Sequence, residues 1–263
     1  MARLLLTVGV IPARYDSIRF PGKILAPISG KPMIQHVYER ARQAKLLHSV
    51  VVATDDQRIM DVVHDFGGHA IMTARYHRNG TDRIAEVLRT RKEDIAVNIQ
   101  GDEPLIDPES IDEAIRPFYQ FYRFHGFHGL QATTLATDFA DHEEWQDPNM
   151  VKVLCDDLGY ALYFSRAPIP YSKKTGSKIL AKKHIGLYAY RRKFLLQLTE
   201  LPPHPLEISE NLEQLRILGM GERILIVFTK NKSIGVDVPS DVEKVEKAIR
   251  RFQKYRKLNS FGS

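Results

Sequence analysis

The sequence predicts an α/β fold: a mostly parallel sheet flanked by helices, with an inserted β-hairpin or small antiparallel sheet. Its first half alternates short apolar runs with amphipathic segments of helical spacing, which is typical of parallel strands joined by crossover helices. The first run, residues 4–11, is apolar apart from Thr7 and does not alternate with polar residues, as expected of a strand buried on both faces. In the middle of the chain, two apolar runs flank Asp156-Asp157-Leu158-Gly159, a pattern that indicates a hairpin.

In the first half, a few residues that commonly start or end helices set the predicted element boundaries. Pro32 suits the first turn of a helix, where its missing N–H is not needed. Asp55-Asp56 can start a second helix, which Gly67-Gly68 can end in the left-handed conformation. The predicted elements are a strand over residues 4–11, a helix over 32–45, a strand over 50–54, a helix from 55 to 67, a strand over 70–72, a helix over 80–89 and a strand over 95–99.

The second half changes character. A polar, Lys-rich loop spans residues 172–183, and Ser240 with Glu243 has the spacing of a capping box for the last helix. We expect one domain over residues 1–263, in which residues of about 150–190 form an exposed insertion suited to dimerisation. The other predicted elements are hairpin strands over 151–154 and 160–164, a strand over 184–190, a helix over 194–198, a helix over 208–218 and a strand over 224–228.

Composition places the chain among ordinary globular proteins. Of its 263 residues, 43% are hydrophobic and 27% charged, with a net charge of +6. The charge fits a solvated Lys- and Arg-rich C-terminal helix, a small anionic substrate or nucleic acid. Aromatic residues are not interleaved with Lys and Arg in an RNA-binding pattern, which argues against a nucleic-acid module.

The apolar N-terminus is not expected to be a leader or an anchor. It stops at Pro12 without a small-x-small cleavage site, and no segment approaches the roughly 20 apolar residues of a membrane span. We therefore expect a cytoplasmic protein without membrane insertion. The single cysteine, Cys155, excludes an internal disulfide framework and a Cys-rich zinc site.

A cationic loop follows the first predicted strand. Arg14, Arg19 and Lys23 stand close together, and Gly22 allows the backbone to approach a ligand. Loops at the carboxyl ends of such strands bind ligands in open α/β sheets, so the loop suits a polyanion such as a nucleoside triphosphate. The spacing is not that of a P-loop. A merely solvated basic loop is the alternative.

Two acidic residues are the candidates for a metal site. Asp102 directly follows the strand over 95–99, and Asp237 precedes the last helix. Mg²⁺ favours one or two carboxylates together with phosphate oxygens, although aspartates at such positions also serve as turn formers or helix caps. Lys23 would stabilise charge on a reacting phosphorus. Asn79-Gly80-Thr81 would add donors at a helix N-terminus, or form a simple cap.

A second cluster in the back half offers a cation and several hydrogen-bonding groups, as an acidic polyhydroxy ligand requires. His184 and Tyr188 lie four residues apart on one strand and so share a face. The same residues could equally be ordinary surface residues of a sheet and a helix. The cluster comprises Arg166, His184, Tyr188, Glu213 and Gln214. No shared ligand spacing, and hence no metal site, is found among His36, His48, His64, His69 and His77.

With these motifs in order, the chain from about Gly9 to Val245 resembles the 3-deoxy-manno-octulosonate cytidylyltransferase (CMP-Kdo synthetase) family, of the nucleotide-diphospho-sugar transferase-like superfamily. One such motif would be weak, but the ordered set is highly specific. The segments that carry the resemblance are Ile11-Pro12-Ala13-Arg14, Arg19-Phe20-Pro21-Gly22-Lys23, Ala53-Thr54-Asp55, Asn79-Gly80-Thr81-Asp82, Asn98-Ile99-Gln100-Gly101-Asp102-Glu103-Pro104, Gly159-Tyr160-Ala161-Leu162-Tyr163-Phe164-Ser165-Arg166, His184-Ile185-Gly186-Leu187-Tyr188 and Leu212-Glu213-Gln214-Leu215-Arg216.

The resemblance implies a Rossmann-like nucleotidyltransferase that is a homodimer in the bacterial cytoplasm. It would transfer CMP from CTP to the anomeric hydroxyl of Kdo for lipopolysaccharide biosynthesis; another 2-keto sugar acid, such as 8-amino-Kdo or a sialic-acid-like substrate, is the alternative. Gln100 would lie near the cytosine, and Asp102 and Asp237 would hold Mg²⁺. The catalytic residues would be Lys23, Arg19, Asp102 and Asp237. The nucleotide would contact Ala13, Arg14, Arg19, Lys23, Asn79, Gly80, Thr81, Gln100 and Asp102. The sugar would face Arg166, His184, Tyr188, Glu213 and Gln214.

Overall fold

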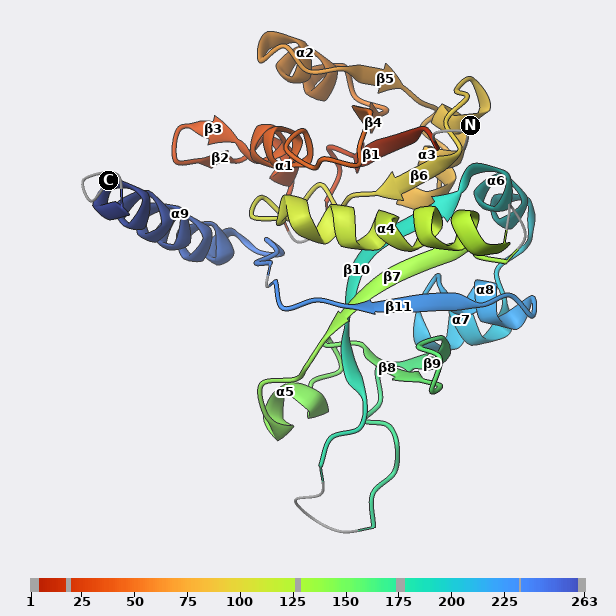
Figure 1. Ribbon diagram of the computed structural model, residues 1–263. Coiled ribbons are helices and arrows are strands. Elements are labelled where there is room, and N and C mark those ends of the chain that lie inside the picture. Colours follow the sequence, from red (N-terminus) through yellow and green to blue (C-terminus); the bar gives the residue numbers. More distant parts are fainter. Residues whose placement is uncertain (1–4, 18–19, 126–128, 174–177, 232, 260–263) are drawn as a thin grey trace.

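The computed structural model describes residues 5–17, 20–125, 129–173, 178–231 and 233–259 (Figure 1). In these residues, nine strands form one sheet whose main order is β11-β7-β10-β6-β1-β4-β5, with β8 paired to β10 and β9 to β8. The strands are β1 (Thr7–Ala13), β4 (Ser49–Thr54), β5 (Ala70–Met72), β6 (Ile95–Asn98), β7 (Ala132–Thr137), β8 (Lys152–Cys155), β9 (Ala161–Ser165), β10 (Lys182–Arg191) and β11 (Ile224–Phe228); β2 (Pro27–Ile28) and β3 (Lys31–Pro32) form a separate antiparallel pair.

Helices cover both faces of this sheet. Val10 of β1 packs in a buried cluster with Ile84 of α3, whereas the next residue, Ile11, packs in a second cluster with Ile34 of α1. The apolar side chains of β1 therefore pack in two cores, one on each face of the sheet, as predicted for a strand covered on both sides. The helices are α1 (Met33–Ala41), α2 (Gln57–Asp65), α3 (Gly80–Arg89), α4 (Pro108–His125), α5 (His142–Gln146), α6 (Arg192–Glu200), α7 (Pro205–Glu210), α8 (Leu215–Gly219) and α9 (Pro239–Asn259), with a short 3-10 helix, η1 (Lys23–Leu25).

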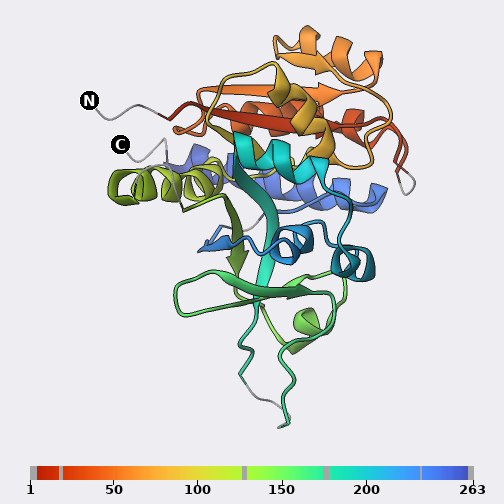
Figure 2. The same cartoon turned by 90° about the vertical axis from the view of Figure 1, so that its right-hand side faces the viewer.

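The sheet is parallel in one half and mixed in the other. β6, β1, β4 and β5 run parallel to one another, and β11 runs parallel to β7. Between these groups, β10 is antiparallel to both β6 and β7. The pairing of β10 with β7 shifts register between Ile185 and Tyr188. Away from the main sheet, β10 pairs with the antiparallel β8–β9 hairpin, which extends beyond the layered body (Figure 2).

The predicted fold class is confirmed, and several elements match their predicted bounds. The helix over residues 80–89 and the strand over 224–228 are α3 and β11, and the predicted hairpin is β8–β9. Gly67 closes α2 with φ +77°, as predicted. The first strand begins at Thr7 and continues through Pro12 to Ala13, and α1 ends at Ala41 rather than Lys45.

Two predictions about local structure are wrong. The helix over residues 208–218 is two helices, α7 and α8, because Asn211 adopts the left-handed conformation with φ +52°. Glu213 and Gln214 consequently lie in the turn between these helices rather than within one. The Ser240 capping box is also absent: α9 begins at Pro239, and the Asp241 carboxylate accepts the N–H groups of residues 237 and 238 at 3.0 and 3.2 Å.

The helix α4 and the strand β7 were not predicted. α4 covers the same face of the sheet as α1 and α2, and β7 supplies the parallel partner of β11. Among the described residues, no helix combines the length and apolar character needed to cross a membrane.

Candidate active site

Two adjoining cavities lie where β1 and β6 end. The smaller has a volume of about 320 Å³ and the larger about 800 Å³, and Gly80, Gln100 and Glu213 line both. The loop after β1 and the loop after β6 border the smaller cavity, and β10 with the turn before α8 borders the larger one. This is the edge of a parallel sheet at which ligands of open α/β folds bind.

The loop after β1 brings a lysine to the smaller cavity. Gly22 adopts φ +69°, and its N–H donates to the Tyr15 carbonyl at 3.1 Å. A side chain at this position would be strained, and its Cβ would lie 3.2 Å from the Tyr15 hydroxyl. The glycine therefore permits the turn from which Lys23 begins η1. Arg14 lines the same cavity and is exposed, whereas Arg19 lies outside the described residues.

Two aspartates from distant parts of the chain meet at Lys23. The ammonium of Lys23 lies 2.7 Å from Asp102 Oδ2 and 3.9 Å from Asp237 Oδ1. The main chain fixes this convergence, because the Val236 N–H donates to the Asp102 carbonyl at 2.9 Å. Lys23 is largely buried, with 12% of its side chain exposed, whereas Asp102 and Asp237 expose 35% and 59%. Both carboxylates are thus open to an additional ligand.

The two aspartates fit a magnesium ion that also binds phosphate. Both offer hard carboxylate oxygens, and both approach the same nitrogen atom. Among the described residues there is no group of three or more His, Cys, Asp or Glu residues that could hold a metal. Mg²⁺ commonly uses one or two carboxylates and takes its remaining ligands from phosphate and water, so this donor set suits a metal that arrives with a nucleotide.

Glu103 and Lys183 line the larger cavity but were not predicted from the sequence. Desolvation, together with the neighbouring charge of Asp102, raises the pKa of the Glu103 carboxyl to about 7. Its position directly after Asp102 was the available signal. Lys183 forms an ion pair with Glu144 of α5, and no sequence pattern marks it.

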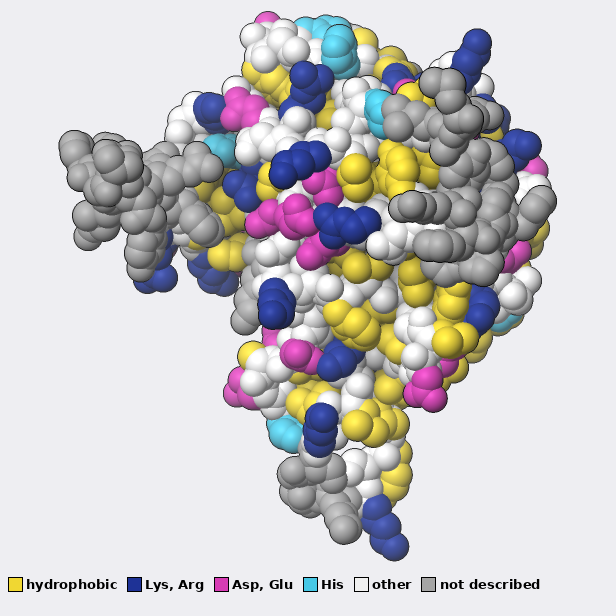
Figure 3. All heavy atoms as spheres, in the orientation of Figure 1, with side chains coloured by type: hydrophobic (Ala, Val, Ile, Leu, Met, Phe, Trp, Pro, Cys, Tyr) yellow, Lys and Arg dark blue, Asp and Glu magenta, His cyan; other side chains and the backbone are white. Residues whose placement is uncertain are grey.

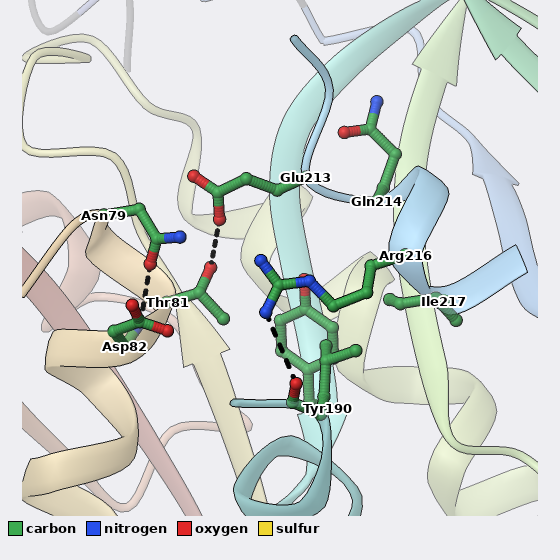
Figure 4. Close-up of a pocket in the computed structure, with 9 residues that line it drawn as sticks. Asn79, Thr81, Asp82, Tyr190, Glu213, Gln214, Arg216 and Ile217 are labelled. Carbon is green, nitrogen blue, oxygen red and sulfur yellow. Dashed lines mark hydrogen bonds between the residues drawn. The ribbon is translucent and has the colours of Figure 1, made fainter. Parts of the chain in front are cut away.

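The N-terminus of α3 separates the two cavities. Asn79 caps the helix by accepting the Asp82 N–H at 2.8 Å. Gly80 packs closely on the first strand, since a Cβ there would lie 3.0 Å from Pro12. The Thr81 hydroxyl donates to Glu213 Oε2 at 2.8 Å, and the two side chains face each other between α3 and the turn before α8 (Figure 4). Asn79 and Gly80 therefore face the smaller cavity, whereas Thr81 is engaged at the larger one.

The remaining predicted nucleotide residues also lie at the smaller cavity. Ala13, the last residue of β1, and Asp102 line it. Gln100 lies at the junction of the cavities, where its Nε2 donates to the Gly186 carbonyl at 3.1 Å. This bond directs the side chain of Gln100 towards β10. The structure thus brings every predicted nucleotide residue that it describes to the smaller cavity, except Thr81, which lines the larger one.

The predicted second cluster also comes together, around the larger cavity. Arg166 directs its Nε at the Glu210 carbonyl at 2.9 Å and its Nη1 at the Pro148 carbonyl at 3.1 Å. Within the described residues, its guanidinium hydrogen bonds go to main-chain carbonyl oxygens. Its positive charge is therefore available to an anion. The cavity-lining members of the cluster are Arg166, His184, Tyr188, Glu213 and Gln214.

His184 is held as a neutral ring. It lies between Phe164 and Tyr188, with ring centroids 5.2 and 5.4 Å away, and its Nε2 is 3.0 Å from the Thr134 hydroxyl. Desolvation lowers the pKa of His184 to about 3, so the ring is uncharged at neutral pH. A neutral imidazole can exchange hydrogen bonds with hydroxyl groups without adding charge to the cavity.

Four buried polar atoms of residues that line this cavity have no hydrogen-bond partner in the part of the chain that the structure describes. They are Oε2 of Glu103, Oγ of Ser233, the hydroxyl of Tyr188 and Nε2 of Gln214. Leaving such groups unpaired destabilises a fold by about 1–3 kcal/mol each, and burial raises the pKa of Tyr188 well above its usual value, so it remains a hydroxyl. A polar ligand in the larger cavity would satisfy the Tyr188 hydroxyl and the Gln214 amide.

Comparison with known proteins gives a consistent set of similarities. A sequence model described as "Cytidylyltransferase" matches residues 8–224. A 3-deoxy-manno-octulosonate cytidylyltransferase of Geotalea uraniireducens is 50% identical over 253 residues, which is 92% of this chain and 98% of that protein. The protein of the same name from Geobacter sulfurreducens is 48% identical over 252 residues, covering 92% and 98%.

A solved structure shares the fold closely. It is described as CMP:2-keto-3-deoxy-manno-octonic acid synthetase complexed with CTP, and it superposes with a TM-score of 0.87 at 42% sequence identity. The match covers 94% of this chain and 99% of that one.

Proposed function

The chain belongs to the cytidylyltransferase family, and from this premise we propose that it transfers CMP from CTP to the anomeric hydroxyl of 3-deoxy-manno-octulosonate (Kdo), giving CMP-Kdo and pyrophosphate. The observation that carries the proposal is the pair of adjoining cavities: Lys23 and Asp102 line one, and Arg166 lines the other. Asp237 lines the second cavity and lies 3.9 Å from the Lys23 ammonium. CTP in one cavity and the sugar acid in the other would meet where the cavities join.

The smaller cavity would hold CTP. Arg14 and Lys23 supply positive charge, and the N-terminus of α3 supplies main-chain donors that favour an anion. In the reaction, the acceptor oxygen bonds to the α-phosphorus, the bond to the β-phosphate oxygen breaks and the hydroxyl proton is lost. Because Lys23 is largely buried and held by Asp102, its charge is fixed before the reaction begins, as electrostatic stabilisation of a transition state requires.

Asp102 and Asp237 would hold the magnesium ion. When bound there, Mg²⁺ neutralises phosphate charge and favours departure of pyrophosphate. Lys23 would keep the two carboxylates close together before the metal arrives. Gln100, fixed by the Gly186 carbonyl, would border the nucleotide and the acceptor at the same time.

The larger cavity would hold the sugar acid. Arg166 suits its carboxylate, because a guanidinium presents paired donors to a planar anion. Tyr188, Gln214 and neutral His184 suit its hydroxyl groups, and Glu213 would accept a hydrogen bond from one of them. These contacts recognise a hydroxylated acid, and a cytidylyltransferase for another 2-keto sugar acid remains the competing proposal.

We also propose that the chain works as one nucleotidyltransferase domain in a cytoplasmic homodimer. Leu158 and Leu162 of the β8–β9 hairpin and Phe228 of β11 expose 73%, 61% and 53% of their surface. Hydrophobic side chains gather over this part of the molecule in Figure 3. Burial of such a patch against a second copy would support dimerisation through the segment around residues 150–190. The CMP-Kdo product would be used in lipopolysaccharide synthesis.

A pyrophosphate-release assay tests the function directly. The purified chain should release pyrophosphate only when CTP, Kdo and Mg²⁺ are all present, and mass spectrometry should identify CMP-Kdo. Release with a related acid such as 8-amino-Kdo, but not with Kdo, would transfer the assignment to the competing substrate. A salt-sensitive gel shift with nucleic acid, together with inert CTP, would refute the enzyme proposal.

A further inference from the structure

Lys152 is a fully buried lysine that lies outside both cavities. It is the first residue of β8, its exposed fraction is 0%, and it lines neither cavity. Its ammonium donates to two main-chain carbonyl oxygens, that of Asp147 at 2.7 Å and that of Arg166 at 2.6 Å. Lysine is almost never fully buried without such partners, so the bonds explain how the fold tolerates it.

The two carbonyl groups belong to two different segments, each of which contributes residues that line the larger cavity. Asp147 starts the segment that leads into β8, and its carbonyl also accepts the Met150 N–H at 3.0 Å. Arg166 directly follows the last residue of β9. Asn149, Met150 and Arg166 all line the cavity. The Lys152 ammonium therefore joins the segment before β8 to the residue after β9.

The side chain of Arg166 also bonds to the segment before β8, and in addition to the end of α7. Its Nη1 donates to the Pro148 carbonyl at 3.1 Å and its Nε to the Glu210 carbonyl at 2.9 Å. The Arg166 N–H donates to Glu210 Oε2 at 2.9 Å. Lys152 thus bonds to the carbonyl oxygen of Arg166, while other segments bond to the N–H and the guanidinium of the same residue. Together these bonds fix the position from which the Arg166 guanidinium faces the cavity.

We propose that Lys152 is a positioning residue for the acid substrate, acting through Arg166. By bonding to the Arg166 carbonyl, it fixes the guanidinium in the orientation in which it receives the carboxylate. The inference rests on the proposed function, because it takes Arg166 as the group that binds the carboxylate. Lys152 touches neither substrate, so its effect on the acid depends on the presence of Arg166.

A double-mutant cycle tests this dependence. Lys152→Met, Arg166→Ala and the double variant are compared by the KM for Kdo and the KM for CTP. Hydrogen bonds to charged groups correspond to about one to two orders of magnitude in an equilibrium constant, so Lys152→Met should raise the KM for Kdo about 10- to 100-fold. We expect the KM for CTP to stay within about twofold. In the Arg166→Ala background, Lys152→Met should change the KM for Kdo by less than about twofold.

Two outcomes overturn the proposal. Independent effects in the double variant would show that Lys152 does not act through Arg166, and an equal rise in both KM values would show a general structural role. If Lys152→Met does not fold, Lys152→Gln, which keeps a donor on a shorter side chain, is read by the same criteria. The wild-type assay separates the two proposals, because absence of Kdo-dependent pyrophosphate release refutes the function itself.

Arg191 provides the matched control. It is a cation with 8% of its surface exposed, and its Nε donates to the Leu130 carbonyl at 2.8 Å, near the end of β10 remote from the hairpin. It lines neither cavity. Arg191→Met should lower the Tm while leaving both KM values within about twofold. A selective rise in the KM for Kdo in this variant would remove the specificity claimed for Lys152.

Discussion

Lys23 and Asp102, which lie 79 residues apart in the sequence, form a 2.7 Å ion pair at the carboxyl edge of the sheet. Lys23 follows β1, and Asp102 follows the adjacent parallel strand β6. Asp237 joins them at 3.9 Å from the same ammonium. Three segments that are remote in the chain therefore place opposite charges at one point, where a triphosphate and its metal would be bound.

Replacing Lys23 by Met should slow turnover by roughly 100- to 1000-fold, the scale of losing one preorganised charge-stabilising group. Initial rates of pyrophosphate release at saturating CTP and Kdo measure this. Lys31, whose ion pair with Glu39 is surface-exposed, provides the control, and Lys31→Met should retain its rate. Near-normal turnover in the Lys23 variant would remove this residue from the mechanism.

The metal proposal is tested by amide substitutions at the two aspartates. Asp102→Asn and Asp237→Asn should each abolish Mg²⁺-dependent activity, because an amide lacks the charge that a hard divalent cation requires. Activity is titrated with Mg²⁺, and circular dichroism confirms the fold. Asp138→Asn, which removes an exposed partner of Lys182, should give an unaltered titration. Wild-type titration curves for the two site variants would contradict the assignment.

Arg166→Ala should weaken binding of the acid far more than binding of CTP. The guanidinium bonds to main-chain carbonyls and carries a charge that faces the larger cavity. We expect the KM for Kdo to rise about 10- to 100-fold, the range of a charge-assisted hydrogen bond, with the KM for CTP within about twofold. A matching rise in both constants would indicate that Arg166 only supports the structure.

The neutral ring of His184 makes stability depend on pH. Its pKa is about 3 in the folded chain and about 6.5 when unfolded, so the unfolded chain binds the additional proton as pH falls below that value. The stability contribution is complete above pH 6.5 and is lost progressively towards pH 3. Between pH 7 and 5.5, the free energy of unfolding of the wild type should fall by about 1 kcal/mol more than that of His184→Gln. Urea denaturation at both pH values measures it, and parallel changes would contradict the assignment.

Local signals in the sequence predicted the parallel half of the fold well. α3 has a strong cap at Asn79 and an uninterrupted amphipathic pattern, so its bounds could be predicted. The sequence pattern also placed Asp102 at the ligand-binding edge of the sheet, because it directly follows a predicted strand. The position of Asp237 before the last helix left a helix cap as the alternative, and its meeting with Asp102 was implied by the family resemblance.

Features set by tertiary burial escaped prediction. Ile208, Leu212 and Leu215 keep helical spacing across Asn211, and this pattern hid the break because periodicity does not report a single left-handed residue. Lys152 reads as a surface residue by type, and only the three-dimensional structure shows it bonded to two carbonyls. A helix cap can be read from neighbouring residues in the sequence. The role of a buried polar group cannot, because its partners lie in segments whose spacing in the sequence shows no relation.

The break at Asn211 is itself testable, because φ +52° is favourable for glycine and tolerated by asparagine but costs other residues about 1 kcal/mol or more. Asn211→Ala should lower the free energy of unfolding by about 1 kcal/mol, whereas Asn211→Gly should stay near the wild type. Urea denaturation of the pair measures this difference. The turn also places Glu213 and Gln214 at the larger cavity, so the alanine variant should raise the KM for Kdo more than the glycine variant does. Equal stability and equal KM values in the two variants would show that α7 and α8 are separated by their packing rather than by the conformation of residue 211.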